Sequence, residues 1–303
     1  MGSMPSKRIS DCNICRCKSR FHHLCIVAIV TFTTDFGSDN PDVALLKGAI
    51  LKEVPDVQLI DITHGVRKFD ISEAAFHIKK ALPHFPIGST HIVGVRSAAS
   101  ETSPHRAATF AKQHVIAADT GIFSLIGQPE ALVNLDAPAA ERFWPTFPEL
   151  ASFVPAAVRL ARGNGLNHLG QPAPSCVEAK SMQPRIDDAS IIGEVIFVDG
   201  YGNAVTNISR ADFHAAVGGR PITIRLRSTR MEIKRIHTTY ADVPVGERVA
   251  VFNHMDLLEI AMNNHQVPGG HGGADSLLGL QRGTAIRISI GEEAPAPDFF
   301  AFS

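Results

Sequence analysis

The first half of the chain alternates strand patterns with helix patterns. Residues 25–32 form an uninterrupted run rich in β-branched side chains, which is typical of a strand buried on both faces. Residues 42–54 then repeat apolar side chains at helical spacing. The same alternation continues with a strand at 58–62, a helix at 72–82, and strands at 90–95 and 114–118. This order predicts a Rossmann-like α/β domain with a parallel sheet and right-handed crossovers.

One more helix is expected before the pattern changes. The Ser152 hydroxyl can cap its N-terminus, Pro155 is tolerated in its first turn, and the helix would run to Arg162. Gly163 follows directly and supplies a stop signal. The predicted N-terminal domain is therefore residues 25–172.

The second half of the chain has shorter elements. Residues 173–190 carry several prolines and no clear period, which indicates a linker between domains. Beyond them, apolar segments separated by glycine-rich turns predict strands at 192–198, 221–226, 248–252 and 284–290. A helical pattern is clear mainly at 210–217. Residues 191–303 are therefore predicted to form a compact β domain, either a sandwich or a barrel.

The composition indicates a folded protein without a polyanionic partner. The 303 residues carry 29 Lys and Arg against 30 Asp and Glu, a net charge of −1, and 45% of them are hydrophobic. This hydrophobic fraction excludes a disordered chain, and the balanced charge argues against nucleic acid or anionic lipid as a partner. The longest apolar run, residues 24–30, is shorter than the roughly 20 residues that span a bilayer. We expect no nucleic acid and no membrane.

Four of the five cysteines lie within the first 25 residues. Because no disulfide framework is visible, a cytoplasmic location is expected. Cys12, Cys15 and Cys17 could form a zinc cluster with nearby histidines, but a poorly ordered leader at residues 1–24 fits this short basic segment better. We therefore expect no metal and leave the leader out of the predicted fold.

Polar side chains follow the predicted strands of the first domain, where ligands bind in α/β sheets. Asp35 comes just after the first strand and can accept two hydrogen bonds from a ribose diol, although an Asx-turn or helix cap explains it equally well. His64 and Arg96 follow the next two strands, and His64 fits a structural hydrogen bonder better than a catalyst. The sequence contains no phosphate loop, zinc-protease helix or nucleophile elbow, which disfavours those enzyme classes.

A second polar cluster follows the strand at 192–198. The segment Asp199-Gly-Tyr201-Gly-Asn203 joins an aromatic face to an amide. That pair suits adenine, which can stack on the ring and be read along its edge by the amide. A β-turn explains the same letters, so both interpretations stay open.

Several short motifs occur in the order seen in one family. They are residues 33–37 (Thr-Thr-Asp-Phe-Gly), 47–48 (Lys-Gly), 61–64 (Asp-Ile-Thr-His), Asp119-x-Gly121, 201–208 (Tyr-Gly-Asn-Ala-Val-Thr-Asn-Ile), and Asn253 with Glu259-Ile-Ala261. Together they resemble S-adenosylmethionine (SAM) hydroxide adenosyltransferases, relatives of the fluorinase and chlorinase, over about residues 27–290. The resemblance implies an α/β domain followed by a C-terminal β-barrel. It also implies a homotrimer, no cofactor, and SAM as a substrate bound between the N-terminal domain of one subunit and the C-terminal domain of its neighbour.

The resemblance also assigns SAM-binding residues. By the part of SAM that each would contact, they are Asp35 for the ribose, Phe69 as an apolar wall, Tyr201 and Asn203 for adenine, Asp199 for the methionine ammonium, and Asn253 and His254 for the methionine carboxylate. His254 replaces the family's usual serine, but it can still donate a hydrogen bond to a carboxylate. Most of the expected SAM-binding residues are therefore present.

The family's catalytic residues are replaced in this chain. Family hydrolases hold water with an Asp, an Arg and a His. Arg96 stands at the Asp position, the family's Arg-Arg pair aligns with His105-Arg106, and the His motif becomes residues 147–151, Phe-Pro-Glu-Leu-Ala. We predict that Arg96 and His105 form a replacement catalytic site that attracts the nucleophile. A surface-facing Arg96 paired with an acid stays open as the alternative.

The predicted function is hydrolysis of SAM to adenosine and methionine, by attack of water or hydroxide at C5′. Because the sulfonium sulfur leaves as a neutral thioether, the leaving group needs no proton, and the protein mainly aligns and desolvates the nucleophile. Two alternatives stay open: attack by another nucleophile such as chloride, and binding of SAM or adenosine without turnover.

Overall fold

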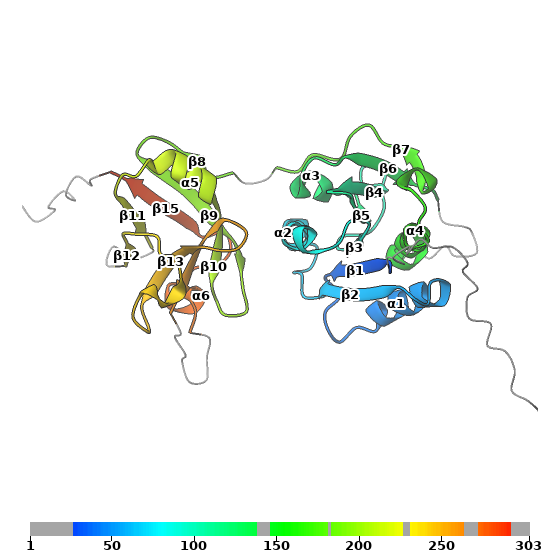
Figure 1. Ribbon diagram of the computed structural model, residues 1–303, viewed down its shortest axis with the longest axis horizontal. Helices are drawn as coiled ribbons and strands as arrows, with labels where there is room; N and C mark the ends of the chain where they lie inside the picture. Colours follow the sequence, from blue (N-terminus) through cyan, green and yellow to red (C-terminus); the bar gives the residue numbers. More distant parts are fainter. Residues whose placement is uncertain (1–26, 138–145, 181–182, 227–230, 264–271, 292–303) are drawn as a thin grey trace, which may run out of the picture.

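The computed structural model describes residues 27–137, 146–180, 183–226, 231–263 and 272–291 (Figure 1). Its N-terminal part is built on a seven-stranded sheet in the order β2-β1-β3-β5-β4-β6-β7. The strands are β1 (Ile29–Thr34), β2 (Gln58–Thr63), β3 (Thr90–Gly94), β4 (His105–Phe110), β5 (Gln113–Ala118), β6 (Ala131–Leu135) and β7 (Gly170–Pro172). The predicted α/β fold is confirmed, and the four strands read from the sequence are β1, β2, β3 and β5.

Only half of this sheet is parallel, so the prediction of a parallel sheet was wrong for the rest. β1 pairs parallel with β2 and β3, and β3 pairs parallel with β5. β4, β6 and β7 run antiparallel to their neighbours. The change of direction comes from a tight turn between β4 and β5, in which Ala111 and Lys112 both have positive φ. Such a turn joins antiparallel strands without a crossover helix.

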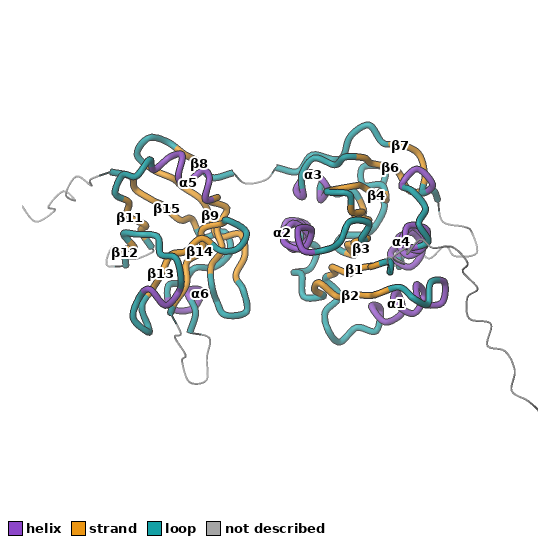
Figure 2. Tube along the Cα trace, in the orientation of Figure 1, coloured by secondary structure: helices purple, strands orange, loops and turns teal. Residues whose placement is uncertain are grey.

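Helices cover both faces of the sheet (Figure 2). The helices are α1 (Asp42–Glu53), α2 (Ile71–Ala81), α3 (Ile122–Ile126) and α4 (Val154–Ala161). α1 packs with α4 over a core that includes Phe32, and α2 packs with α3 over a second core that includes Val93. Both side chains are completely buried, which explains why the central strands carry apolar residues on both faces.

The last helix of this domain starts before Ser152. A π-helical turn, Glu149–Phe153, leads directly into α4, and Ser152 lies buried inside that turn. Phe153 has helical φ and ψ angles, so the backbone continues without the break that an N-cap requires. The predicted Ser152 cap was therefore wrong. The helix ends at Ala161 with Arg162 as its C-cap, one residue before the predicted end, and the left-handed Gly163 follows as predicted.

The C-terminal part is an antiparallel sheet that closes almost into a barrel. The strand order is β12-β11-β15-β9-β10-β14-β13, and β8 pairs with β9. His237, just after β12, forms a β-bridge with Val251 of β13, which brings the two edges of the sheet together. The strands are β8 (Arg185–Ile186), β9 (Ser190–Val198), β10 (Ala204–Ser209), β11 (Ile222–Arg225), β12 (Glu232–Ile233), β13 (Arg248–Phe252), β14 (Leu257–Met262) and β15 (Ala285–Ile290), with helices α5 (Arg210–Val217) and α6 (Ala274–Leu277). The barrel, not the sandwich, is observed.

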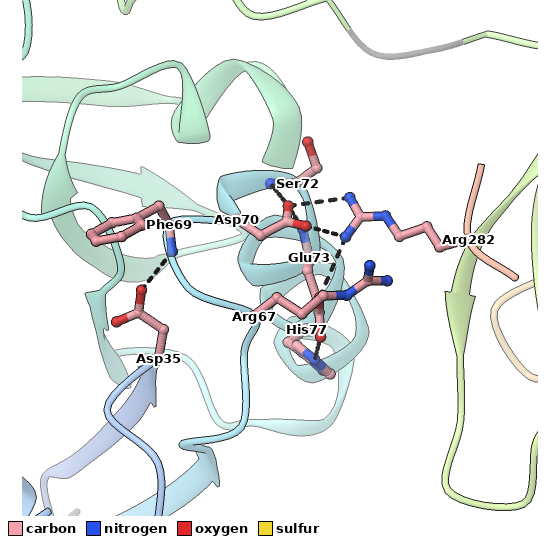
Figure 3. Close-up of polar contacts among 8 residues, drawn as sticks. All are labelled: Asp35, Arg67, Phe69, Asp70, Ser72, Glu73, His77 and Arg282. Carbon is pink, nitrogen blue, oxygen red and sulfur yellow. Dashed lines mark hydrogen bonds and ion pairs between the residues drawn. The ribbon is translucent and has the colours of Figure 1, made fainter.

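The two parts meet at α2. Asp70 caps this helix by accepting hydrogen bonds from the backbone N–H groups at its start. Arg282 of the C-terminal part donates to both carboxylate oxygens of Asp70 and lies 3.3 Å from a Glu73 oxygen (Figure 3). Phe76 of α2 also stacks on Phe197 of β9, with ring centroids 4.9 Å apart. β8 forms inside the segment predicted as a linker, and the division into domains stays a prediction.

Three expectations concern the leader, a membrane span and a metal site. The leader, with Cys12, Cys15 and Cys17, lies outside the described residues. No described helix is long and apolar enough to cross a membrane. Across the described ranges, no group of three or more His, Cys, Asp or Glu side chains is arranged to hold a metal ion.

Candidate functional site

Asp35 lies at the carboxyl end of β1, where the sheet offers a ligand site. The side chain is 8% exposed, and its Oδ2 accepts a hydrogen bond of 2.7 Å from the backbone N–H of Phe69 (Figure 3). Lys68 donates to the backbone carbonyl of Asp35. The segment before α2 therefore fixes the orientation of the carboxylate predicted to bind ribose.

Phe69 is placed by the same contact. Its backbone has φ of 64°, in the left-handed region that a bulky residue rarely adopts, and its side chain is 70% exposed. An exposed ring on a constrained backbone beside Asp35 is consistent with the predicted apolar wall. Because such strain persists only where surrounding contacts hold it, the Asp35–Phe69 hydrogen bond accounts for the conformation.

A chain of side chains supports the strand end next to Asp35. His64 Nδ1 hydrogen-bonds the buried Thr34 hydroxyl at 2.8 Å, and His64 Nε2 lies 3.1 Å from Asp61 Oδ1. Lys47 donates to the other Asp61 oxygen at 2.5 Å. Burial alone would raise the pKa of Asp61, but the contacts with Lys47 and His64 outweigh it and lower the pKa. These residues therefore position β1, as expected of a structural His64.

Arg96 and His105 lie on either side of the loop between β3 and β4. Arg96 is exposed, has φ of 54°, and makes no ion pair with any described residue, so the alternative of an acid-paired Arg96 finds no partner there. His105 Nε2 donates to the Ser97 carbonyl at 2.9 Å, and its ring packs edge-on against Phe153. Burial lowers the pKa of His105, which favours the neutral ring. Their predicted catalytic role stays a prediction.

Arg106, the second residue aligned with the family's Arg pair, is committed to the fold. Its guanidinium pairs with the completely buried Asp119 and also donates to Asn134 at 2.8 Å. Asp119 accepts a further hydrogen bond from the Val177 backbone at 3.0 Å. The Asp119-x-Gly121 motif thus anchors the segment that leaves the α/β domain.

Glu149 is a residue that sequence reasoning missed. It opens the π-helical turn, is 4% exposed, and reaches back to the carboxyl ends of β1 and β3. Burial raises the pKa of its carboxyl, and the charges of Asp35 and Asp42 add to that rise. The acid itself is visible within residues 147–151, but no local pattern shows that it is buried next to Asp35.

In the barrel, Asp199 organises the loop that carries Tyr201 and Asn203. Asp199 accepts hydrogen bonds from the Tyr201 backbone at 2.8 Å, the Asn203 backbone at 2.9 Å, and the Asn203 side-chain amide at 3.0 Å. The turn interpretation is therefore correct for this loop. It also leaves the Tyr201 ring 85% exposed, in a position to stack on a ligand.

The remaining predicted residues line a cavity of about 280 Å³ in the barrel. Asp199, Asn253 and His254 are all on its wall. Two residues that were not predicted as SAM contacts also line it: the buried Glu259 accepts hydrogen bonds from Tyr240 at 2.6 Å and from Asn253 at 3.1 Å. Burial and the Glu259 carboxylate raise the pKa of Tyr240, so its hydroxyl stays a donor.

The predicted SAM-binding residues of the α/β part do not line the barrel cavity. The barrel cavity is bordered on the α/β side by Phe76 and Lys80 of α2, and neither Asp35 nor Phe69 lines it. The Asp35 group and the barrel cavity are each assigned by the resemblance to a different part of SAM, and that assignment stays a prediction.

Comparison with known proteins matches a separate family model to each of the two parts of the chain. Family models for the SAM hydroxide adenosyltransferase N-terminal and C-terminal domains match residues 30–170 and 193–287. A relative from Thermus thermophilus named (R)-S-adenosyl-L-methionine hydrolase is 30% identical over 86% of this chain and 98% of its own length. A Nocardia brasiliensis fluorinase is 24% identical over 87% of this chain and 97% of its own.

Solved structures give the same picture of the fold. An uncharacterized conserved protein from Thermotoga maritima superposes with a TM-score of 0.74 at 25% identity, over 87% of this chain and 99% of its own. Two family models in the right order, together covering most of the chain, leave one conclusion. The chain belongs to the SAM hydroxide adenosyltransferase family.

Proposed function

We propose that this protein hydrolyses SAM to adenosine and methionine. The observation that carries the proposal is the buried Asp35 carboxylate, held by the Phe69 backbone at the carboxyl edge of the sheet. A carboxylate has acceptor sites beyond the one that Phe69 uses, and a ribose diol can donate to them. Relatives named (R)-S-adenosyl-L-methionine hydrolase, at 25–30% sequence identity, support the same reaction.

The reaction needs little from the protein beyond placement. A water oxygen attacks C5′ of SAM, the C5′–S bond breaks, and its electron pair stays on sulfur as the thioether of methionine. The water loses one proton, and the adenosine 5′-hydroxyl forms. Holding water and C5′ in line, in a pocket closed to solvent, supplies most of the rate that such a displacement needs.

A second nucleophile is supported by one observation. Arg96 is an exposed cation at the end of β3, without an ion pair among the described residues, and it would attract an anion. Attack by chloride at the same carbon would give chloroadenosine. Hydrolysis stays the first proposal, because the charge of Arg96 attracts hydroxide and halide alike and so does not select a halide.

The assay is incubation of the purified protein with SAM, with and without chloride, followed by chromatography. Adenosine and methionine in equal amounts in both samples are the expected products. Chloroadenosine formed only with chloride would move the function to halide transfer. Tight binding of SAM with no product would make the protein a SAM-binding protein and overturn the enzyme proposal.

We also propose a homotrimer in which SAM binds between the α/β domain of one subunit and the barrel of its neighbour. This arrangement is supported by the lining of the barrel cavity, which includes Asp199, Asn253 and His254 but neither Asp35 nor Phe69. The one described cysteine, Cys176, is a free thiol, which is compatible with the cytoplasmic location that we propose.

Shared sites predict that two inactive variants complement each other. Asp35→Asn removes the ribose contact, and Tyr201→Ala removes the exposed ring, so each homotrimer should be inactive. In co-expressed mixed trimers, about a quarter of the interfaces would pair an intact α/β domain with an intact barrel, and about that share of activity should return. Activity that stays at the level of the separate variants would contradict the shared site.

A further inference from the structure

Glu149 occupies the edge of the sheet next to Asp35. A Cβ atom built on Gly94, the last residue of β3, would lie 3.3 Å from Glu149 Oε1 and 3.1 Å from Thr34 Cγ2. Thr34 directly precedes Asp35 at the end of β1. The Glu149 carboxyl therefore rests over a glycine that leaves room for it, between the ends of two central strands.

A buried hydroxyl nearby lacks a partner. Ser97, three residues after Gly94, is 6% exposed, and its Oγ forms no hydrogen bond with any described residue. It lies near enough to Glu149 to oppose the rise of that carboxyl's pKa, although outside hydrogen-bond geometry. Buried hydroxyls are almost always paired with protein or with an ordered water, so the two groups are suited to share a water molecule.

Acidic side chains from two elements act on the Glu149 carboxyl. Asp35 follows β1 and Asp42 begins α1, and both raise the pKa of Glu149 in addition to burial. Arg96 lies in the loop after β3, and His105 of β4 holds that loop through the Ser97 carbonyl. A carboxylate with a raised pKa is a better proton acceptor near neutral pH than an exposed one.

We infer that Glu149, with the Ser97 hydroxyl, binds the water that attacks C5′ and that the Glu149 carboxylate accepts its proton. The inference rests on the proposed hydrolysis of SAM. As the water oxygen bonds to C5′ and the C5′–S bond breaks, the water proton moves to Glu149. Methionine leaves as a neutral thioether, and the carboxylic acid later returns its proton to solvent. Residues 147–151 lack the histidine of the family motif, and Glu149 takes its place as the general base.

The test compares Glu149→Gln with Glu101→Gln, an exposed glutamate of the same β3–β4 loop. General-base help is worth about 10²–10⁴-fold, so Glu149→Gln should lower kcat about 100-fold or more while adenosine binding by calorimetry stays unchanged. Glu101→Gln should keep the wild-type rate. Ser97→Ala should lower kcat in the same direction by a smaller factor.

The pH profile separates catalysis from a structural role. Wild-type kcat should rise as pH increases through the raised pKa of Glu149, because only the carboxylate accepts a proton; Glu149→Gln should lack this limb. When folding raises the pKa of a carboxyl, the folded protein loses stability as pH rises above that group's ordinary pKa of about 4. The difference in melting temperature, Glu149→Gln minus wild type, should therefore become more positive as pH is raised.

The outcomes distinguish the two proposals. If wild type forms no product from SAM, hydrolysis fails and the role of Glu149 fails with it. If wild type forms adenosine but Glu149→Gln keeps its rate and its pH limb, only the role of Glu149 is overturned. Loss of adenosine binding in Glu149→Gln, or a rate unaffected by Ser97→Ala, would likewise contradict the shared water.

Discussion

Replacing Asp35 with asparagine is expected to lower kcat/KM for SAM about 100-fold or more, with little change in stability. The carboxylate accepts the Phe69 N–H and would accept from the ribose diol, whereas the amide keeps only one oxygen for these donors. Hydrogen bonds to a charged group are worth about 1.5–3 kcal/mol each. Steady-state kinetics and calorimetric binding of adenosine measure the effect.

Asp39→Asn is the matched control for this variant. Asp39 lies four residues farther along, is exposed, and accepts a hydrogen bond of 2.9 Å from the neighbouring Ser38 hydroxyl. Its replacement should leave kcat/KM at the wild-type value. Equal losses in the two variants would mean that the loop after β1 as a whole, and not the Asp35 carboxylate, governs SAM binding.

Replacing Arg106 with methionine is expected to cost about 3–5 kcal/mol of unfolding free energy. Asp119 is completely buried, and removing the guanidinium leaves its charge with only backbone donors. Because Asp119 also holds the Val177 backbone, the exit of the chain from the α/β domain should loosen too. Urea unfolding followed by circular dichroism measures the loss.

Arg159→Met provides the comparison for the buried pair. Arg159 faces Asp136 at 3.8 Å, with both side chains about half exposed, and such pairs contribute at most about 1 kcal/mol. A loss in Arg106→Met no larger than in Arg159→Met would show that the Arg106–Asp119 pair is replaceable by apolar packing. Activity lost in Arg106→Met beyond its loss of folded protein would instead point to a catalytic Arg106.

The strand pattern was the part of the fold most open to sequence reasoning. β-branched runs and helical spacing depend on neighbours close in the chain, so β1, α1 and α2 could be predicted within a few residues. β4, β6 and β7 could not, because a tight turn at Ala111 and Lys112 reverses the chain without a strong local signal. Glycine or asparagine usually marks such a turn, and neither occurs there.

The candidate site divides in the same way. Asp35, Asp199 and Asn253 were found because each belongs to a short ordered motif. Glu259 belonged to a motif as well, but its partner Tyr240 lies 19 residues away and is joined to it only across the barrel. Contacts of that kind depend on strand register, which no local pattern encodes.

The sequence by itself determined the alternation of elements and the family motifs, and it predicted that the family's catalytic residues are replaced. Only the tertiary structure decided what stands near Asp35. It brings Glu149, more than 100 residues away in the chain, over Gly94 beside the end of β1. The physical reason is that burial, neighbouring charge and an unpaired Ser97 hydroxyl are properties of a folded neighbourhood. Burial and neighbouring charge raise the pKa of the Glu149 carboxyl, which the position of this residue in the sequence does not suggest.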